Sequence, residues 1–139
     1  MYKRQADGGS MASFKRAQAG AGLRFIHVNT LSGWIELNSN NTVSYTSASD
    51  YRLKENNVPI SDGIARVKNL KPYRFNWKAE PDKTVDGFFA HEAQEVVPEA
   101  VDGEKDGKDM QLVDYSKFVP LLTAAVQELT ARIEALEGN

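Results

Sequence analysis

The sequence predicts an α+β fold: a small mixed domain of short strands and helices, followed by a long C-terminal helix and preceded by a β-rich N-terminal remnant. Two observations predict it. Apolar residues over 119–136 recur alternately every three and four positions, as in helices that pair with other helices. Upstream, short strand-like runs are separated by Asn, Ser and Gly, which are typical of turns. The 139 residues provide room for one domain, or one domain plus a fragment.

The N-terminal third is expected to contain a linker and three strands. Residues 1–22 are interpreted as a linker or non-native start, because they are rich in Gly, Ala and Ser and show no stable period. Strands are predicted at Leu23–Val28, Gly33–Leu37 and Thr42–Thr46. Three short strands bury little apolar surface, so residues 23–48 are expected to end a longer β-rich protein.

Residues 49–139 are expected to form a continuous mixed domain. Its predicted elements, in chain order, are a helix at Ser61–Leu70 capped by Ser61 or Asp62, a strand at Tyr73–Trp77, a turn at Asp82–Asp86, a buried strand at Gly87–Ala90, a helix at Glu92–Val97, a polar loop at Asp102–Asp109 and a strand at Met110–Val113.

The C-terminal helix is predicted over about residues 115–137, with Asp114 as its N-cap. Pro120 lies several residues inside, where it predicts a kink or a tighter first turn. The helix presents an a/d seam, defined as Val119, Leu122, Val126, Leu129, Ile133 and Leu136.

The seam has two interpretations. It packs on the helix's own domain, or it pairs with other copies of the chain. Small flanking residues favour the approach of other helices: Ala124, Ala125, Thr130 and Ala131. β-branched residues at a with Leu at d favour a dimer in an isolated parallel coiled coil, so the helix alone does not set the oligomeric state.

Composition excludes several classes of function. The formal net charge of −2 argues against sequence-independent nucleic-acid binding. No cysteine is present, which excludes disulfides, thiolate catalysis and cysteine metal sites. With only His27 and His91, a histidine-rich metal site is not expected, and no cofactor is predicted. No apolar run reaches the ~20 residues of a membrane span, and no signal peptide is visible, so a soluble protein made in a cytoplasm is expected.

The candidate chemistry lies at Ser49-Asp50-Tyr51-Arg52-Leu53-Lys54. A serine hydroxyl needs a base to become a useful nucleophile, and lysine serves as that base when its pKa falls toward neutrality. A bent structure over five residues brings the hydroxyl of Ser49 to the amine of Lys54. Arg52 is expected to help lower the amine's pKa, and Asp50 to cap the turn or pair with Arg52. The alternative is a plain capping motif at a helix start.

Four blocks in order resemble the endosialidase-type C-terminal chaperone family of phage tail spikes, tail fibres and neck appendages. They cover about residues 47–137 and are Ser49–Asn56 with its Ser-Asp-x-Arg-Leu-Lys pattern, Val67–Phe75 with its Leu-Lys-Pro-Tyr pattern, Gly87–Val101 with its Gly-Phe-x-Ala-x-Glu and Val-x-Pro-x-Ala-Val patterns, and Asp114–Leu122 with its Tyr-Ser and Pro-Leu-Leu patterns.

The resemblance implies a self-cleaving serine endopeptidase that acts once. Ser49 is then the nucleophile on the carbonyl of Ala48, Lys54 is the general base, and water resolves the intermediate. Residues 23–48 become the end of a β-rich fibre passenger. Residues 49–139 become a chaperone that forms a homotrimer, promotes folding in the host cytoplasm during virion assembly and is released. The passenger remains in the virion tail. No nucleic-acid or membrane partner is implied.

Other polar and aromatic residues have simpler interpretations. His91 is expected to be structural, and Glu92 and Glu95 to form exposed or interchain pairs. Trp34 and Trp77 are expected to lie in a core rather than to stack on sugars. The loop 102–109 lacks the spacing of a calcium site.

Two alternatives to self-cleavage by a fibre chaperone stay open. One is a non-cleaving structural or receptor-binding tip of a trimeric fibre, in which Ser49 only caps a turn. The other is a membrane- or DNA-associated regulator that uses the same cleavage, as the related domain of the eukaryotic myelin regulatory factor implies. An ordinary hydrolase with an external substrate is disfavoured, because nothing else in the chain resembles a catalytic triad.

Overall fold

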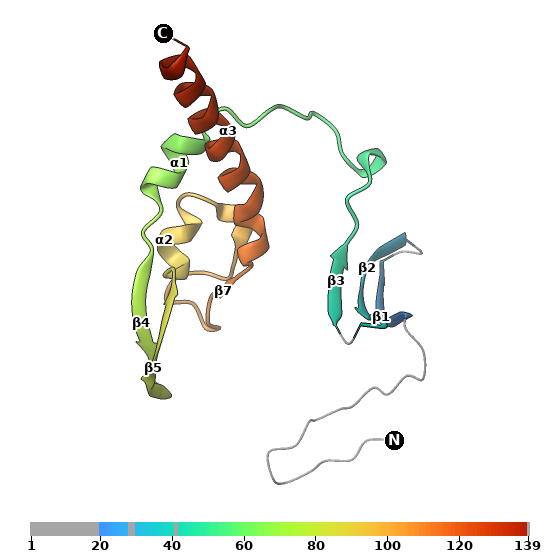
Figure 1. Ribbon diagram of the computed structural model, residues 1–139. Helices are drawn as coiled ribbons and strands as arrows, with labels where there is room; N and C mark the ends of the chain where they lie inside the picture. The colour runs from blue at the N-terminus through green and yellow to red at the C-terminus, as the bar shows by residue number, and fades with distance from the viewer. Residues whose placement is uncertain (1–19, 28–29, 41, 139) are drawn as a thin grey trace, which may run out of the picture. The chain divides into compact units, whose positions relative to one another are not determined.

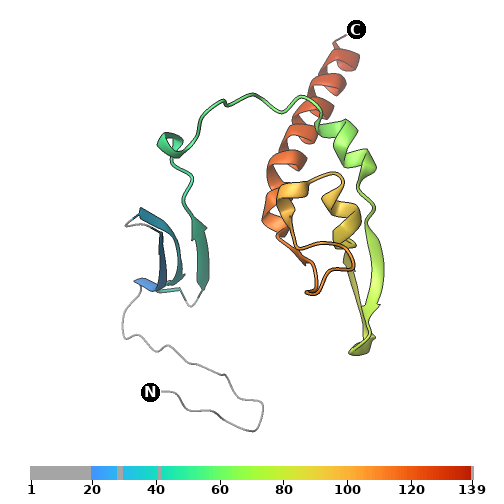
Figure 2. The same ribbon diagram turned by 180° about the vertical axis from the view of Figure 1, so that it is seen from behind.

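The computed structural model describes residues 20–27, 30–40 and 42–138. The chain divides into two compact units, which meet between Asn57 and Val58 in the sequence (Figures 1 and 2). Strands and helices are both present, and a long helix ends the chain, so the predicted α+β class is confirmed. No helix in the described part of the chain is long and apolar enough to cross a membrane.

The first unit contains a three-stranded antiparallel sheet in the order β1-β2-β3, which confirms the three predicted strands. The strands are β1 (Gly20–His27), β2 (Thr30–Leu37) and β3 (Val43–Ser47). β1 begins inside the segment predicted as linker. The predicted strand end at Val28 and residues 1–19 of that linker lie outside the described residues.

Gly33 permits the close approach of β2 and β3. It is buried and pairs with Ser47, and a Cβ atom at Gly33 would collide with the backbone oxygen of Thr46. The absence of a side chain at Gly33 therefore allows the end of β3 to lie tightly against β2. One residue later, the Ala48 amide donates a hydrogen bond to the Ser32 carbonyl at 2.7 Å.

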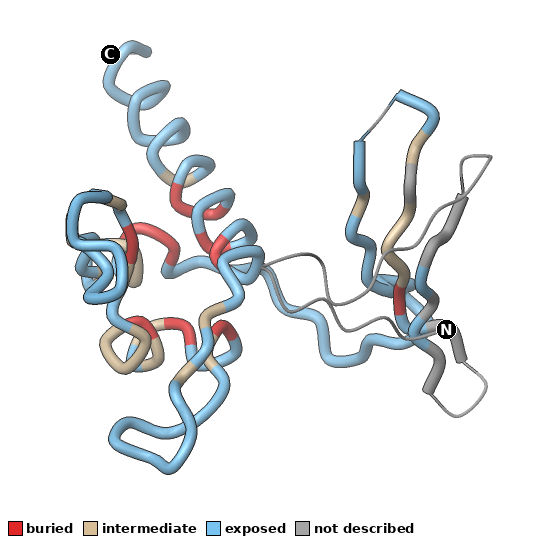
Figure 3. Tube along the Cα trace, turned by 90° about the horizontal axis from the view of Figure 1, so that it is seen from below, coloured by how far each residue is buried: buried red, intermediate tan, exposed pale blue. Residues whose placement is uncertain are grey.

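The second unit has a small apolar core. Its buried residues come from α2 (Ala90–Gln94), from the short 3-10 helix η2 (Pro98–Ala100) with its N-cap Val97, and from α3 (Phe118–Glu137). They appear red in Figure 3 and are Ala93, Val97, Ala100, Phe118 and Leu121. Helix α1 (Gly63–Asn69) contributes buried Ile64 and partly buried Val67, as its helical spacing predicts.

A two-stranded hairpin of β4 (Tyr73–Trp77) and β5 (Glu80–Gly87) corrects two predictions. β4 confirms the predicted strand. However, the predicted turn at 82–86 is part of β5, which pairs with β4 so that Arg74 lies opposite Asp86 and Asn76 opposite Thr84. Side-chain bonds join both of these pairs. The predicted strand at 87–90 is also wrong. β5 ends at Gly87, and Phe89 is already the N-cap of α2.

The remaining short elements lie close to their predicted positions. α2 begins and ends earlier than the predicted helix 92–97, and Pro98 opens η2 instead of merely ending a helix. β6 (Val101–Asp102) pairs with β7 (Leu112–Val113), so the predicted strand 110–113 is shorter than expected. The chain between them contains Gly103 at a φ of 90°, a left-handed conformation that favours glycine.

The N-terminus of α1 is capped from a distant part of the chain. Asp62 occupies the N-cap position but makes no side-chain cap, so the predicted local cap is wrong. Instead the Glu128 carboxylate on α3 accepts hydrogen bonds from the amides of Gly63, at 2.6 Å, and Ile64, at 3.2 Å. A Cβ on Gly63 would lie 2.5 Å from the Ala125 amide nitrogen, so only glycine allows this approach.

The helical stretch predicted over about residues 115–137 is present, but it opens with the one-turn 3-10 helix η3 (Tyr115–Lys117), and α3 itself begins only at Phe118. Asp114 caps that turn by accepting from the Ser116 amide at 3.0 Å, which confirms the predicted cap. Pro120 is the third residue of α3, where its missing N–H removes no intrahelical bond. The tighter first turn predicted from Pro120 is therefore present as η3.

α3 has two apolar faces. One faces its own unit and includes buried Ala124 and Ala125, which the sequence predicted to admit a foreign helix but which in fact contact α1. The other is the seam. Its six residues are all exposed, from 47% for Leu122 to 78% for Leu136. Figure 1 shows the C-terminal end of α3 extending past α1. Packing on its own unit therefore does not account for the seam.

Candidate functional site

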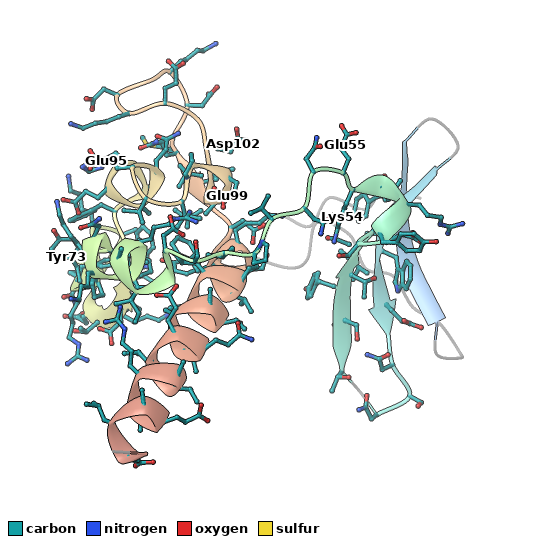
Figure 4. All side chains as sticks on the ribbon, turned by 90° about the horizontal axis from the view of Figure 1, so that it is seen from above. Lys54, Glu55, Tyr73, Glu95, Glu99 and Asp102 are labelled. Atoms are coloured by element: carbon teal, nitrogen blue, oxygen red, sulfur yellow. The ribbon has the colours of Figure 1, made fainter. Side chains whose placement is uncertain are left out.

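Ser49 and Lys54 lie within hydrogen-bonding distance in the first unit. The Lys54 ammonium donates to the Ser49 hydroxyl oxygen at 2.7 Å. The residues between them form the single 3-10 turn η1 (Tyr51–Leu53), closed by the Leu53 amide on the Asp50 carbonyl at 3.1 Å and the Lys54 amide on the Tyr51 carbonyl at 3.0 Å. Figure 4 labels Lys54 and Glu55 on the segment just after this turn. The sequence-predicted pair is thus brought together by local structure.

Asp50 and Arg52 form a second contact in the same turn. One carboxylate oxygen of Asp50 accepts from the Arg52 amide and from its Nε, both at 2.9 Å. The other accepts from Nη2 at 2.7 Å. The Arg52 side chain, then its amide, stabilise the ionised carboxylate and lower the pKa of Asp50, while Asp50 raises the pKa of Arg52. Both alternatives predicted for Asp50, capping and pairing, are present.

The carbonyl side of the Ala48–Ser49 bond is fixed by the sheet. β3 pairs with β2 up to Ser47, and Ala48 adds one more backbone hydrogen bond, to Ser32. Sequence reasoning did not identify Ser32 or Gly33 as supporting residues. The Gly33 signal was visible, since a glycine inside a strand pattern indicates a close backbone approach.

The arrangement is suited to proton transfer between the two side chains. In the charged state the Lys54 amine donates to the hydroxyl. In the neutral state its lone pair accepts the hydroxyl proton across the same 2.7 Å. The turn and both side chains are exposed. Arg52, predicted to act on Lys54 through its charge, has that charge offset by direct pairing with Asp50.

The other sequence candidates lie in different settings. The ring of His91 stacks on Phe89 with centroids 6.0 Å apart. The Glu92 carboxylate pairs with Lys71 at 3.0 Å within the same chain, and Lys71 lowers the pKa of Glu92. Glu95 is exposed, as Figure 4 illustrates. These residues belong to the second unit, and none of their bonds involves Ser49 or Lys54.

The two tryptophans differ from each other. Trp34 is half-buried on β2 and donates to Glu36 at 3.2 Å. Trp77 is 58% exposed with its edge against Phe75, so the expectation that it lies in a core is wrong. Its position at the end of the two-stranded hairpin explains the exposure, because no further layer covers that end in the described chain. Among described residues no group of three or more His, Cys, Asp or Glu could hold a metal ion.

Comparison with known proteins adds an independent observation. Residues 49–102 match the peptidase-family model described as "Chaperone of endosialidase", so the match begins at Ser49 itself. The chain is 35% identical over 98 residues to the long tail fibre protein Gp37 of Enterobacteria phage K3, covering 66% of this chain. It is 30% identical over 90 residues to Gp37 of Escherichia phage AR1, covering 58% of this chain.

The matched region is a small part of those relatives. The chain spans 8% of the length of each of these two fibre proteins. Within this chain, the match contains the Ser49–Lys54 pair, α1, the β4–β5 hairpin and α2. The resemblance predicted from the sequence is therefore confirmed: residues 49–102 carry the motifs and the match of the chaperone-of-endosialidase family.

Proposed function

We propose that residues 49–139 form an intramolecular chaperone that trimerises a phage tail-fibre passenger and then releases itself by cleavage between Ala48 and Ser49. The observation that carries this proposal is the 2.7 Å contact between Lys54 and Ser49, at the first residue of the family match. The relatives are long tail fibre proteins, which supports a fibre as the passenger.

The reaction needs only this chain and one water. Ser49 Oγ attacks the carbonyl carbon of Ala48 while neutral Lys54 takes the hydroxyl proton. The C–N bond then breaks, the proton passes to the leaving Ser49 nitrogen, and an ester joins Ala48 to Ser49 Oγ. Water hydrolyses the ester, giving an Ala48 carboxylate and restoring the Ser49 hydroxyl. Attack on the adjacent bond needs no substrate pocket, because the fold supplies the proximity.

The exposed seam of α3 supports self-association of the chain, and the number of three copies comes from the family resemblance. The seam of α3 is exposed, while the apolar residues of the helix's other face, Phe118, Leu121, Ala124 and Ala125, are already buried in the second unit. Joining three chains at one end raises the effective concentration of the passenger strands. This helps because strands of different chains align slowly when a β-rich fibre forms.

The proposal also includes the boundaries and places of the two parts. Residues 23–48 are the passenger end, and residues 49–139 are the chaperone. Assembly takes place in the host cytoplasm, and the passenger remains in the virion tail.

Intact-mass measurement of the purified chain tests the cleavage. Wild type is expected to yield one fragment that ends at Ala48 and one that begins at Ser49. The Ser49→Ala and Lys54→Ala chains are expected to remain whole. A wild-type chain that sedimentation shows to be a trimer, yet that stays whole, contradicts the peptidase part. A non-cleaving fibre tip is then the correct alternative, and the observation that favours it is that Asp50 already caps a turn at this position.

The uncleaved Ser49→Ala chain provides the test of assembly. It is expected to sediment as a trimer, and Leu129→Asp, at the centre of the seam, is expected to sediment as a monomer. Gln127→Asp introduces the same charge at an exposed position of α3 outside the seam and serves as the matched control. A Ser49→Ala chain that is monomeric at all concentrations contradicts the trimer.

A further inference from the structure

We propose that the Asp50–Arg52 ion pair is a positioning clamp, which holds the one-turn helix that brings Lys54 to Ser49. This inference deepens the proposed function and rests on it. Asp50 and Arg52 act through geometry. Neither touches the reacting atoms: their contacts are with each other and with the backbone of the turn.

The contact between Ser49 and Lys54 requires a folded backbone between them. Ser49 and Lys54 are five residues apart, and an extended chain would separate their backbones by about 17 Å. Their side-chain atoms are 2.7 Å apart in the structure. The pairing therefore depends on the chain being folded over Tyr51–Leu53.

The turn has no buried apolar residue to stabilise it in the described part of the chain. Tyr51 is 81% exposed and Leu53 is 61% exposed, and no residue of the turn is buried. An isolated helical turn is unfavourable, because it fixes several dihedral angles for very few backbone hydrogen bonds. The two backbone bonds of this turn therefore need local side-chain support.

Asp50 supplies this support by binding both the backbone and the side chain of Arg52. Its carboxylate caps the Arg52 amide and also accepts two parallel bonds from the guanidinium. Such paired bonds carry geometric specificity that a lysine ammonium cannot reproduce. The clamp thus fixes the backbone of Arg52 relative to Asp50, with Ser49 on one side and Lys54 only two residues further on the other.

Arg52→Lys is the decisive variant because it keeps the positive charge and removes the fork. Positioning predicts that the rate of Ala48–Ser49 cleavage falls about tenfold to a hundredfold, as expected for small misplacements of reacting groups. If Arg52 acts through its charge, Arg52→Lys cleaves at the wild-type rate. That result would overturn the clamp.

The β4–β5 hairpin of the second unit supplies a matched control. Arg74 and Asp86 form the same paired contact, at 2.8 and 3.1 Å, and the Arg74 and Arg52 side chains are both 74% exposed. Arg74→Lys is therefore the same chemical change at an equally exposed arginine away from the turn, although its partner Asp86 is more exposed (65%) than Asp50 (40%). It is expected to leave the cleavage rate unchanged. A loss as large as that of Arg52→Lys contradicts a specific role for the clamp.

The pH profile separates positioning from charge. For Arg52→Gln in the whole chain, a clamp predicts a lower plateau rate with the profile's midpoint unchanged. Action through charge predicts a midpoint moved to higher pH with the plateau kept, and contradicts the clamp.

Asp50→Asn retains a capping oxygen but not the ion pair, so its cleavage rate is expected between those of wild type and Asp50→Ala. Equal rates for Asp50→Ala and wild type overturn the proposal.

The same experiment distinguishes failure of the clamp from failure of the proposed function. If wild type cleaves and Ser49→Ala does not, the reaction stands, and the Arg52 variants then decide the clamp alone. If wild type does not cleave at Ala48–Ser49, the proposed function fails first. Circular dichroism of each variant checks that the helices of the second unit remain folded, so that loss of rate is not loss of structure.

Discussion

The two units of this chain are stabilised in different ways. The second unit buries apolar side chains from α2, η2 and α3 around Val97 and Leu121, which are 0% and 2% exposed. The end of the first unit, where Ser49 and Lys54 lie, is held by a sheet edge, a single turn and an ion pair, with no buried residue in the turn. The comparison shows that the candidate chemistry lies where stability is local and polar, while the apolar core lies elsewhere.

The largest expected effect concerns the apolar core of the second unit. Leu121→Ala removes a fully buried side chain, so it should lower the free energy of unfolding of the second unit by about 2–5 kcal/mol. Leu122→Ala, the adjacent seam residue that is 47% exposed, should leave that free energy almost unchanged at low protein concentration. Thermal unfolding followed by circular dichroism measures both. Equal losses for the two variants would show that the buried and exposed faces of α3 are not distinct.

A smaller effect tests the long-range cap of α1. Glu128→Ala leaves the amides of Gly63 and Ile64 without their carboxylate and should cost about 0.5–2 kcal/mol of stability, the usual range for a lost cap. Glu134→Ala, at an exposed position further along α3, is the matched control and should cost less. Denaturant unfolding of both variants provides the measurement. No difference between them would mean that α1 does not need Glu128.

The smallest expected effect lies in the turn and concerns pH. Arg52 stabilises the ionised form of Asp50, so the pKa of this carboxyl is lower in the folded chain than in the unfolded one. The ion pair is therefore complete above the ordinary range of a carboxyl pKa and is lost as pH falls through the lowered value. An NMR titration of the Asp50 carboxyl carbon should show a midpoint below that of Arg52→Gln. Identical midpoints would contradict the pairing in solution.

Much of this organisation could be predicted because it depends on residues close in sequence. The alternation of Tyr73–Trp77 predicted β4, and the period of residues 119–136 predicted α3. Asp50 was correctly expected to cap or pair for the same reason. The contact of Ser49 with Lys54 was expected from the local motif together with its family resemblance, since the spacing alone also fits a plain cap.

The features that were missed depend on residues far apart in sequence or on tertiary contacts. The turn-forming residues of 82–86 belong to a strand because the backbone of β4 pairs with them, as in Arg74 with Asp86 and Asn76 with Thr84. Likewise the α1 cap comes from Glu128, 65 positions from Gly63, and no local pattern at Ser61 or Asp62 reveals it. Ala124 is small because α1 approaches it closely, which the helical period alone could not distinguish from a surface for a foreign helix.

The register of β3 determines what a cut at Ala48–Ser49 leaves behind. The hydrogen bonds of the sheet in the described residues have both partners at or before Ala48, the last being Ala48 to Ser32. Those of the turn, including the Lys54 contact, have both partners at or after Ser49. Hydrolysis of this one bond would therefore divide the segment at the boundary between two separate hydrogen-bond networks. The new carboxyl end would stay tied to β2, and the sheet would lose none of its backbone bonds.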